Sequence, residues 1–134
     1  MTPEQRERYL AGQHVGVLAV AREAGPPLAV PVWYGYEPGG DVVVQMDDTS
    51  VKRRLLDRAG EFSLATQDET PPYRYVTVQG PVVDTRVGVS PADAEALARR
   101  YLDGDDLTGY LAAVDPARTV EVRMRPDRWY AVEL

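Results

Sequence analysis

A cluster of hydroxyl and cationic side chains is the part of this sequence best suited to bind an anion. Thr49 and Ser50 stand where a helix is predicted to begin, and Lys52, Arg53 and Arg54 follow in its first turns. The first N–H groups of a helix have no partner within it, and the helix dipole adds positive charge there. Nearby cations make such an end a phosphate site. The alternative is an exposed amphipathic helix whose cations face only water.

Aromatic side chains gather on two predicted strands. Trp33, Tyr34 and Tyr36 lie on one, and Tyr73 and Tyr75 lie on the other. Because side chains alternate between the faces of a strand, these rings either pack in the core or form a platform for a planar ligand. The pattern alone leaves both interpretations open.

Other reactive groups are scarce. The chain has no cysteine and a single histidine, His14. A histidine-cluster or cysteine-ligated metal site is therefore excluded, and no Ser-His-Asp triad is indicated. Neither a G-x-G-x-x-G loop nor a Walker loop follows a predicted strand. If the protein is an enzyme, a cofactor must supply the chemistry, and no catalytic side chain is assigned.

Size and charge restrict the class of protein further. The 134 residues suit one domain over the whole chain, and the net charge is −6. An acidic chain argues against binding to nucleic acid or to an anionic membrane. The polar first residues lack a signal-peptide core, no apolar run is long enough to span a membrane, and the absence of cysteine suits a reducing compartment. We therefore expect a cytoplasmic protein.

The elements that must position these residues are mostly strands. Apolar, β-branched runs between turn residues predict strands over residues 15–21, 28–36, 42–46, 62–67, 73–89, 119–124 and 128–132. Capping and stop signals predict helices over residues 2–13, 50–59, 90–102 and 106–114. The first three strands are expected to form an antiparallel meander, and the long strand is expected to bend near Gly80. We predict a mainly β fold with inserted helices, in which six or seven antiparallel strands form a nearly closed barrel.

The order of three segments resembles a known family. Leu28-Ala29-Val30-Pro31-Val32-Trp33-Tyr34 comes first, Thr49-Ser50-Val51-Lys52 then opens a helix, and Tyr73-Arg74-Tyr75-Val76-Thr77-Val78-Gln79-Gly80 follows the next strand. This order resembles the split β-barrel superfamily of pyridoxamine 5′-phosphate oxidase-like flavin and deazaflavin proteins. The Pro-Pro-Tyr-Arg-Tyr-Val stretch looks most like the branch that binds coenzyme F-420.

The resemblance implies a set of cofactor-binding residues. In relatives the segment equivalent to Ser50 and Lys52 binds the cofactor phosphate, and the strand equivalent to Val30, Pro31, Val32 and Trp33 lines the ring. Relatives are homodimers with cofactor sites at the subunit interface, so the segment near Trp129 would approach the partner's cofactor. The candidate set is completed by Thr49 beside the phosphate, Arg53 as a second cation and Tyr75 on the long strand.

The sequence departs from the pattern of the true pyridoxamine phosphate oxidases at two places, and both bear on the expected activity. Val51 stands where pyridoxamine phosphate oxidases have an arginine beside the phosphate-binding lysine, and the sequence ends at Leu134, too soon for their long C-terminal substrate motif. An activity other than vitamin B6 oxidation is therefore expected.

The leading hypothesis is an oxidoreductase that uses the deazaflavin coenzyme F-420 to transfer hydride to a small conjugated acceptor. Arg54 and Arg58 add to the cation cluster and suit the anionic tail of that coenzyme. Alternatives are an FMN-dependent oxidoreductase of the same family, a non-catalytic flavin- or deazaflavin-binding protein, and a barrel with no ligand.

Overall fold

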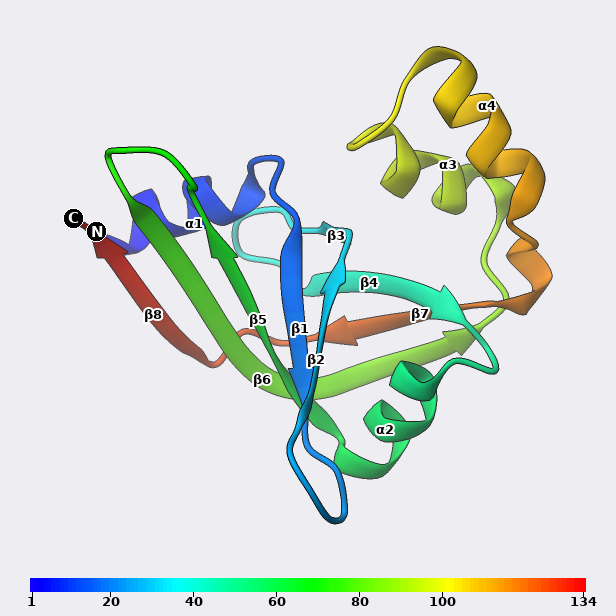
Figure 1. Ribbon diagram of the computed structural model, residues 1–134, viewed down its shortest axis with the longest axis horizontal. Coiled ribbons are helices and arrows are strands. Elements are labelled where there is room, and N and C mark those ends of the chain that lie inside the picture. Colours follow the sequence, from blue (N-terminus) through cyan, green and yellow to red (C-terminus); the bar gives the residue numbers. More distant parts are fainter.

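The protein folds into a bent antiparallel sheet of eight strands with four α-helices, and the computed structural model describes all of residues 1–134 (Figure 1). The strands are β1 (Gly16–Val20), β2 (Leu28–Val32), β3 (Tyr34–Gly35), β4 (Val42–Asp47), β5 (Glu61–Gln67), β6 (Arg74–Val87), β7 (Thr119–Met124) and β8 (Arg128–Glu133). The helices are α1 (Pro3–Ala11), α2 (Val51–Ala59), α3 (Pro91–Arg99) and α4 (Gly104–Ala113), and a 3-10 turn, η1 (Pro116–Arg118), precedes β7. The predicted split β-barrel with inserted helices is confirmed.

The sheet begins and ends at neighbouring positions in the sequence. Its strands follow the order β2-β1-β5-β6-β7-β4-β3, and β8 pairs with β6 outside this path. The two end strands, β2 and β3, are separated only by Trp33. The prediction of one continuous strand over residues 28–36 is therefore wrong, because the strand is interrupted at Trp33. Strand β2 pairs with β1, whereas β3 pairs with β4. In place of the predicted three-stranded meander there are two hairpins, β1–β2 and β3–β4. Trp33 alone joins them, and we call this residue the seam of the barrel.

Strand β6 is long enough to belong to both halves of the barrel. Its first part pairs with β5 and β8, and its second part pairs with β7 after a shift in register between Val82 and Asp84. The predicted bend near Gly80 is visible where β6 changes direction in Figure 1. A Cβ atom on Gly80 would lie 1.7 Å from the carbonyl oxygen of Arg125. Only glycine lets the two backbones come this close.

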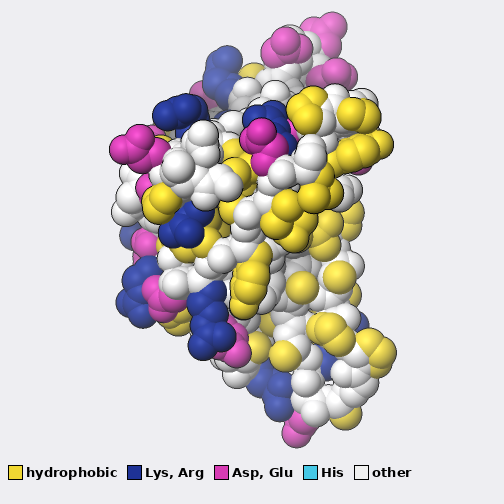
Figure 2. Space-filling model, turned by 90° about the vertical axis from the view of Figure 1, so that its left-hand side faces the viewer, with side chains coloured by type: hydrophobic (Ala, Val, Ile, Leu, Met, Phe, Trp, Pro, Cys, Tyr) yellow, Lys and Arg dark blue, Asp and Glu magenta, His cyan; other side chains and the backbone are white.

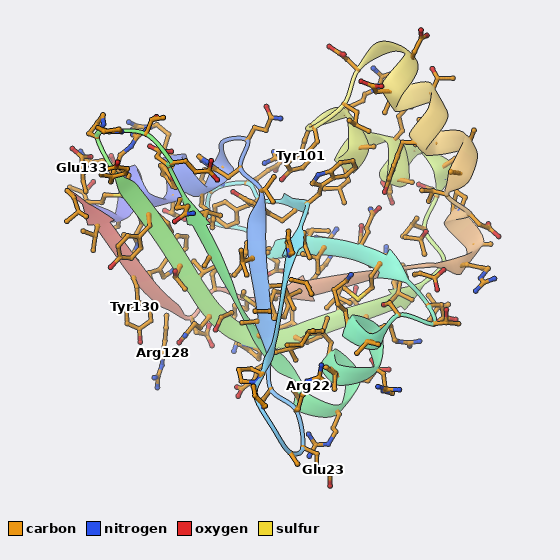
Figure 3. All side chains as sticks on the ribbon, in the orientation of Figure 1. Arg22, Glu23, Tyr101, Arg128, Tyr130 and Glu133 are labelled. Carbon is orange, nitrogen blue, oxygen red and sulfur yellow. The ribbon has the colours of Figure 1, made fainter.

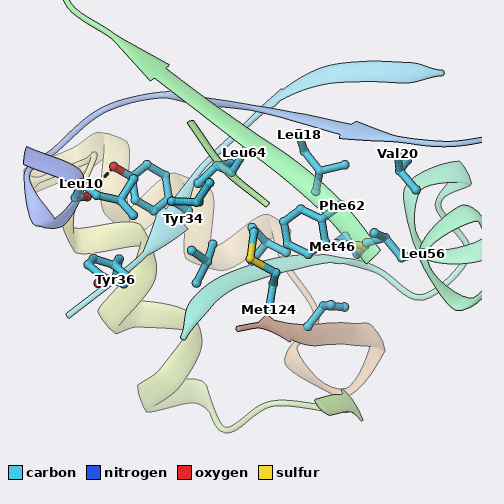
Figure 4. Close-up of a cluster of buried hydrophobic side chains, with 14 of the residues drawn as sticks. Leu10, Leu18, Val20, Tyr34, Tyr36, Met46, Leu56, Phe62, Leu64 and Met124 are labelled. Atoms are coloured by element: carbon cyan, nitrogen blue, oxygen red, sulfur yellow. Dashed lines mark hydrogen bonds between the residues drawn. The ribbon is translucent and has the colours of Figure 1, made fainter. Parts of the chain in front are cut away.

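One hydrophobic core fills the barrel (Figure 4). Its 18 buried residues come from α1, α2, most of the strands and the turn after β3. Tyr34 is completely buried, and its hydroxyl donates a 2.6 Å hydrogen bond to the carbonyl oxygen of Leu10. Tyr36 is also buried and donates to the carboxylate of Glu7. These two tyrosines are core residues and not a platform for a ligand.

All four predicted helices are present, with ends that differ by up to about three residues from the prediction. Thr2 and Gln5 form the predicted capping box of α1. Gly60 ends α2 with φ of 70°, as its C-cap position requires. Helices α3 and α4 form a pair between β6 and β7, and Figure 1 shows this pair beside β3 and β4. None of the helices combines the length and the apolar character needed to cross a lipid bilayer.

Candidate functional site

A pocket of about 290 Å³ lies where β2, β4, α2, α3 and α4 meet. It is lined by Val15, Pro31, Val32, Trp33, Gln45, Lys52, Leu97 and Tyr110. Four of these residues, Pro31, Val32, Trp33 and Lys52, belong to the predicted cofactor-binding set. Mainly apolar walls with a few polar groups are typical of a site for a small organic ligand.

A larger cavity, of about 610 Å³, opens on the outer side of β1, β5 and β6. None of the predicted cofactor-binding residues lines it, and its lining includes two acidic residues, Glu61 and Asp127, and one cation, Arg128. Carboxylates repel an anionic cofactor. The smaller pocket, in which Lys52 is the only charged lining residue and Trp33 and Tyr110 are aromatic, is therefore the better candidate.

The beginning of α2, where Lys52 lines the pocket, carries several groups that are able to bind an anion. Ser50 caps the helix, and its Oγ atom accepts a 3.2 Å hydrogen bond from the N–H of Arg53. The hydroxyl hydrogen of Ser50 remains free to be donated. The N–H groups of Val51 and Lys52 have no partner within the protein. Lys52 makes no ion pair and is the only lysine of the chain, so its ammonium group is free to bind a ligand.

Two other predicted phosphate ligands are occupied by neighbouring carboxylates. The guanidinium group of Arg53 pairs with Asp48 and, at 2.9 Å, with Asp57. The backbone N–H and the hydroxyl of Thr49 both donate to the carboxylate of Asp47. These hydrogen bonds hold the pKa of Asp47 below its usual range, so this carboxylate stays ionised. Thr49 and Arg53 therefore stabilise the turn and leave Lys52 as the cation that faces the pocket.

An aromatic wall closes the other side of the pocket. The ring of Trp33 stacks on that of Tyr101, with centroids 5.0 Å apart and planes 4° from parallel. The ring of Tyr110 lies 5.0 Å from Trp33 at an angle of 50°. Burial raises the pKa of Tyr110 above its ordinary value, so its hydroxyl remains neutral. The Trp33 ring offers a flat and largely apolar surface, which suits a flat conjugated ring.

Hydrogen bonds to the backbone fix the helix pair over the pocket. Tyr101 lies between α3 and the barrel (Figure 3), where its hydroxyl donates to the carbonyl of His14 at 2.7 Å and accepts from the N–H of Tyr34. Next to it, Arg100 donates to the carbonyl oxygens of Tyr34 and Gly12, each at 3.0 Å. The position of the aromatic wall is thus set by two consecutive residues after α3.

Six of the ten predicted residues do not line the pocket. Thr49, Ser50 and Arg53 lie beside it at the start of α2, and the other three lie farther along the sheet. Val30 packs against the hydrophobic core from β2. Tyr75 is exposed on β6, where it pairs with Val132 of β8. Trp129 lies against the core near α1, with its ring 6.0 Å from that of Tyr36.

The sequence reasoning also missed four lining residues. These are Val15, Gln45, Leu97 and Tyr110, and Tyr101, which stacks behind Trp33, was also missed. Leu97 and Tyr110 come from the inserted helices and Tyr101 follows α3, and only the packing of these helices brings them close to Trp33 and the pocket. For Gln45, a polar residue inside an otherwise apolar strand was an available signal.

Comparisons with known proteins agree with this fold. The solved structure of an F420 reductase superposes with a TM-score of 0.77 at 24% identity, covering 92% of this chain and 94% of that one. General stress protein 26 from Bacillus anthracis superposes with a TM-score of 0.71 at 17% identity, covering 98% and 95%. The FAD- and heme-binding protein from Mycobacterium smegmatis gives 0.67 at 20% identity, covering 98% and 70%. These similarities establish the fold.

A search of curated proteins found no match to the chain. The family model described as pyridoxamine 5′-phosphate oxidase, in contrast, matches residues 2–132. This match spans nearly the whole sequence, including β2, the start of α2 and β6, which carry the three motifs of the resemblance. The chain therefore belongs to the pyridoxamine 5′-phosphate oxidase family of split β-barrel proteins.

Proposed function

We propose that the protein is an oxidoreductase that binds coenzyme F-420 in the 290 Å³ pocket and transfers hydride to a small conjugated acceptor. The observation that carries this proposal is that unpaired Lys52 and the flat ring of Trp33 line the same pocket. An anionic group attached to a flat ring system matches both of these residues. Flavins and deazaflavins have this chemistry.

The residues of the pocket have separate roles in this proposal. The ammonium group of Lys52, the hydroxyl of Ser50 and the free N–H groups at the start of α2 hold the phosphate. Pro31 and Val32 support one side of the ring, and Trp33 limits its position at the seam. When bound, the cofactor supplies hydride-transfer chemistry that the side chains lack. The protein orients the reactants and excludes water from them.

The cations of α2 favour F-420 over FMN. Arg54 is exposed and makes no ion pair, and Arg58 has only a weak contact, 3.8 Å, with exposed Glu23. Both are available to the acidic tail that distinguishes F-420 from FMN. The structural similarity to an F420 reductase supports this choice, whereas the similar protein that binds FAD and heme supports a broader range of planar ligands. FMN remains the second candidate for the same pocket.

We also propose that two copies associate through the outer face of the half of the sheet that β2, β1, β5, β6 and β8 form. The strand registers align five uncharged residues from five strands side by side: Pro31, Val17, Ala65, Thr77 and Tyr130. In the adjacent row, Arg128 at the margin is the only charged residue. Arg128 and Tyr130 project from β8 in Figure 3, and Figure 2 shows hydrophobic side chains along one side of the molecule, away from most of the charged ones.

This association would complete the cofactor site. Pro31 belongs both to the uncharged face and to the lining of the pocket. A second copy on that face would therefore cover the pocket opening beside Pro31. An uncharged face of this extent is unusual for a chain in which 27% of the residues are charged, and contact with another copy explains it.

Fluorescence titration of ligand-free protein with F-420, and separately with FMN, tests the proposed cofactor. We expect tight binding of F-420 that weakens as salt is raised, because the anionic tail is held by exposed cations. FMN should bind more weakly and with less dependence on salt. Preferential binding of FMN would move the assignment to the flavin branch, and binding of neither would overturn it.

A further inference from the structure

A second cavity adjoins the proposed cofactor pocket. It has a volume of about 420 Å³ and lies between α3 and the neighbouring residues of β3, β4 and β7. Gln45 and Leu97 line both this groove and the cofactor pocket. The two cavities therefore share part of their walls, and a ligand in the groove would contact the same two side chains as a ring in the pocket.

A buried carboxylate lies in the wall of the groove. Glu121 is the only buried charged residue of the protein, with a side chain that is 6% exposed. A buried charge is costly unless it is closely paired. Its two hydrogen bonds are long, 3.3 Å from Arg123 and 3.4 Å from Gln45, whereas charge-assisted bonds are typically about 2.7–2.9 Å. Glu121 therefore keeps the capacity to accept a stronger donor.

The other polar groups of the groove favour a cation as that donor. Its lining includes four carboxylates, from Glu37, Asp41, Asp93 and Glu121, and two guanidinium groups. Of the guanidinium groups, that of Arg100 donates to backbone carbonyls and that of Arg123 to Glu121.

Gln45 adds a further acceptor to the groove. Its amide NH₂ donates to Glu121 and to the carbonyl oxygen of Asp93, which leaves its own carbonyl oxygen without a donor. The groove thus offers unused acceptors to a group that brings N–H donors and positive charge.

We propose that the groove binds an amino group of the acceptor substrate, with Glu121 as its carboxylate partner and Gln45 as its second acceptor. This inference rests on the proposed function, because the amine belongs to the acceptor only if the cofactor occupies the adjoining pocket. It assigns the substrate class: a small conjugated molecule that carries a primary amine or similar cationic nitrogen. Glu121 is then a specificity-determining residue.

The test uses benzylamine as a probe, with benzyl alcohol and benzoate as neutral and anionic probes of similar shape. Each is titrated into ligand-free protein while the backbone amide signals are followed by NMR. We expect benzylamine to shift the signals of Gly35, Gly40 and Val43, which line the groove, and to leave that of Gly60 unchanged. It should bind at least about tenfold more tightly than the other two probes. Equal affinities for benzylamine and benzyl alcohol would overturn the proposal.

Two variants locate the binding. Glu121→Gln keeps the shape of the side chain and should weaken benzylamine binding about tenfold or more, bringing it close to that of benzyl alcohol. Ala96→Leu fills the groove from α3 without removing the carboxylate and should abolish the shifts. Its matched control, Ala92→Leu, changes an exposed position on the same helix that does not line the groove, and should bind like the wild type. Unchanged binding in both Glu121→Gln and Ala96→Leu would contradict the assignment.

Parallel titration with F-420 separates this inference from the proposed function. Glu121→Gln should bind F-420 as the wild type does. If the protein binds neither F-420 nor FMN but binds benzylamine through Glu121, the cofactor assignment fails and the amine site stands. If F-420 binds and benzylamine does not, the cofactor assignment stands and the amine site fails.

Discussion

Trp33 and Tyr101 join the barrel to its inserted helices by a stacked pair of rings, 5.0 Å between centroids and 4° from parallel. Trp33 is the single residue between the two end strands of the sheet, and Tyr101 follows α3. The pair therefore connects the seam of the barrel to the helices that wall the candidate pocket.

The hydroxyl of Tyr101 should contribute to stability separately from its ring. Tyr101→Phe keeps the stacking but leaves the carbonyl of His14 and the N–H of Tyr34 without this partner. Loss of a hydrogen bond at partly buried groups costs about 1–3 kcal/mol, so the free energy of unfolding in urea should fall by that amount. In Tyr110→Phe, where the removed hydroxyl makes no hydrogen bond, the change should stay within about 0.5 kcal/mol. Equal effects of the two variants would contradict the role given to Tyr101.

Lys52 should be the main side chain that holds the cofactor phosphate. Lys52→Ala should weaken F-420 binding by about 1.5–3 kcal/mol, the value of a charge-assisted hydrogen bond. Fluorescence titration measures the change, and circular dichroism checks that the fold is kept. Arg99→Ala is the control, because it removes the same charge from an exposed position on α3 away from the pocket lining. Unchanged affinity in Lys52→Ala would sink the phosphate site.

The uncharged sheet face should be required for association of two copies. Val17 lies in the middle of the face and is 40% exposed. Val17→Glu would bury an unpaired carboxylate in the interface, at a cost of several kcal/mol. Light scattering at micromolar concentration should therefore show a dimer for the wild type and a monomer for this variant. Val87→Glu introduces the same charge at an exposed residue of β6 outside the face and should remain dimeric. A monomeric wild type would refute the interface.

Gly80 should tolerate no side chain. In Gly80→Ala the new Cβ would lie 1.7 Å from the carbonyl oxygen of Arg125. Strand β6 and the segment after β7, which cross here, would therefore have to move apart. We expect a loss of more than about 3 kcal/mol in the free energy of unfolding, or failure to fold. Gly109→Ala is the matched control: nothing lies within 4 Å of its new Cβ, and alanine in α4 should add about 0.5–1 kcal/mol. A mild effect at Gly80 would contradict the close backbone contact.

Stability in acid should depend on Asp68. Its carboxylate accepts hydrogen bonds from Arg74 at 2.8 Å and from Tyr9 at 2.9 Å, and these hold its pKa below the usual range. A group whose pKa is lowered by folding stabilises the protein above its unfolded pKa, about 3.9 for aspartate, and loses this effect as the pH falls through the folded pKa.

Asp68→Asn should therefore be less stable than the wild type at neutral pH, and the difference should shrink as the pH falls below about 4. Urea midpoints measured across this range provide the test. The control, Thr66→Val, removes a buried hydrogen bond to the carbonyl oxygen of Val76 but no titratable group, so its effect should not change over this pH range. A difference between wild type and Asp68→Asn that stays constant with pH would rule out the linkage.

Local signals were sufficient to predict most of the fold. Alternating apolar residues and turn residues mark the strands, and the capping box at Thr2 and the stop at Gly60 mark helix ends. The break at Trp33 could not be predicted, because the run from Leu28 to Tyr36 has no glycine or charge before Gly35 that would interrupt a strand. Its cause is the closure of the barrel, which requires the chain to pass from one half of the sheet to the other.

The candidate site was predictable only on its β2 and α2 side. Lys52 follows from the physics of a helix beginning, and Pro31 to Trp33 follow from the family resemblance. The pairing of Arg53 with Asp57 could have been inferred from their i, i+4 spacing. Tyr101 and Tyr110 could not be assigned, because their approach to Trp33 depends on how two helices pack against a barrel more than sixty residues away in sequence.

The one-residue seam also has a consequence for how this scaffold diversifies. Only Trp33 connects β2 to β3, so an insertion there would change the positions of these two strands and with them the geometry of the barrel. The segment between β6 and β7 is under no such constraint: it leaves and re-enters the sheet at fixed points and supplies one wall of both cavities. Replacement of the whole segment that contains α3 and α4 would therefore change which ligands fit the two cavities. The side of the pocket formed by β2 and α2, with Lys52, would stay the same.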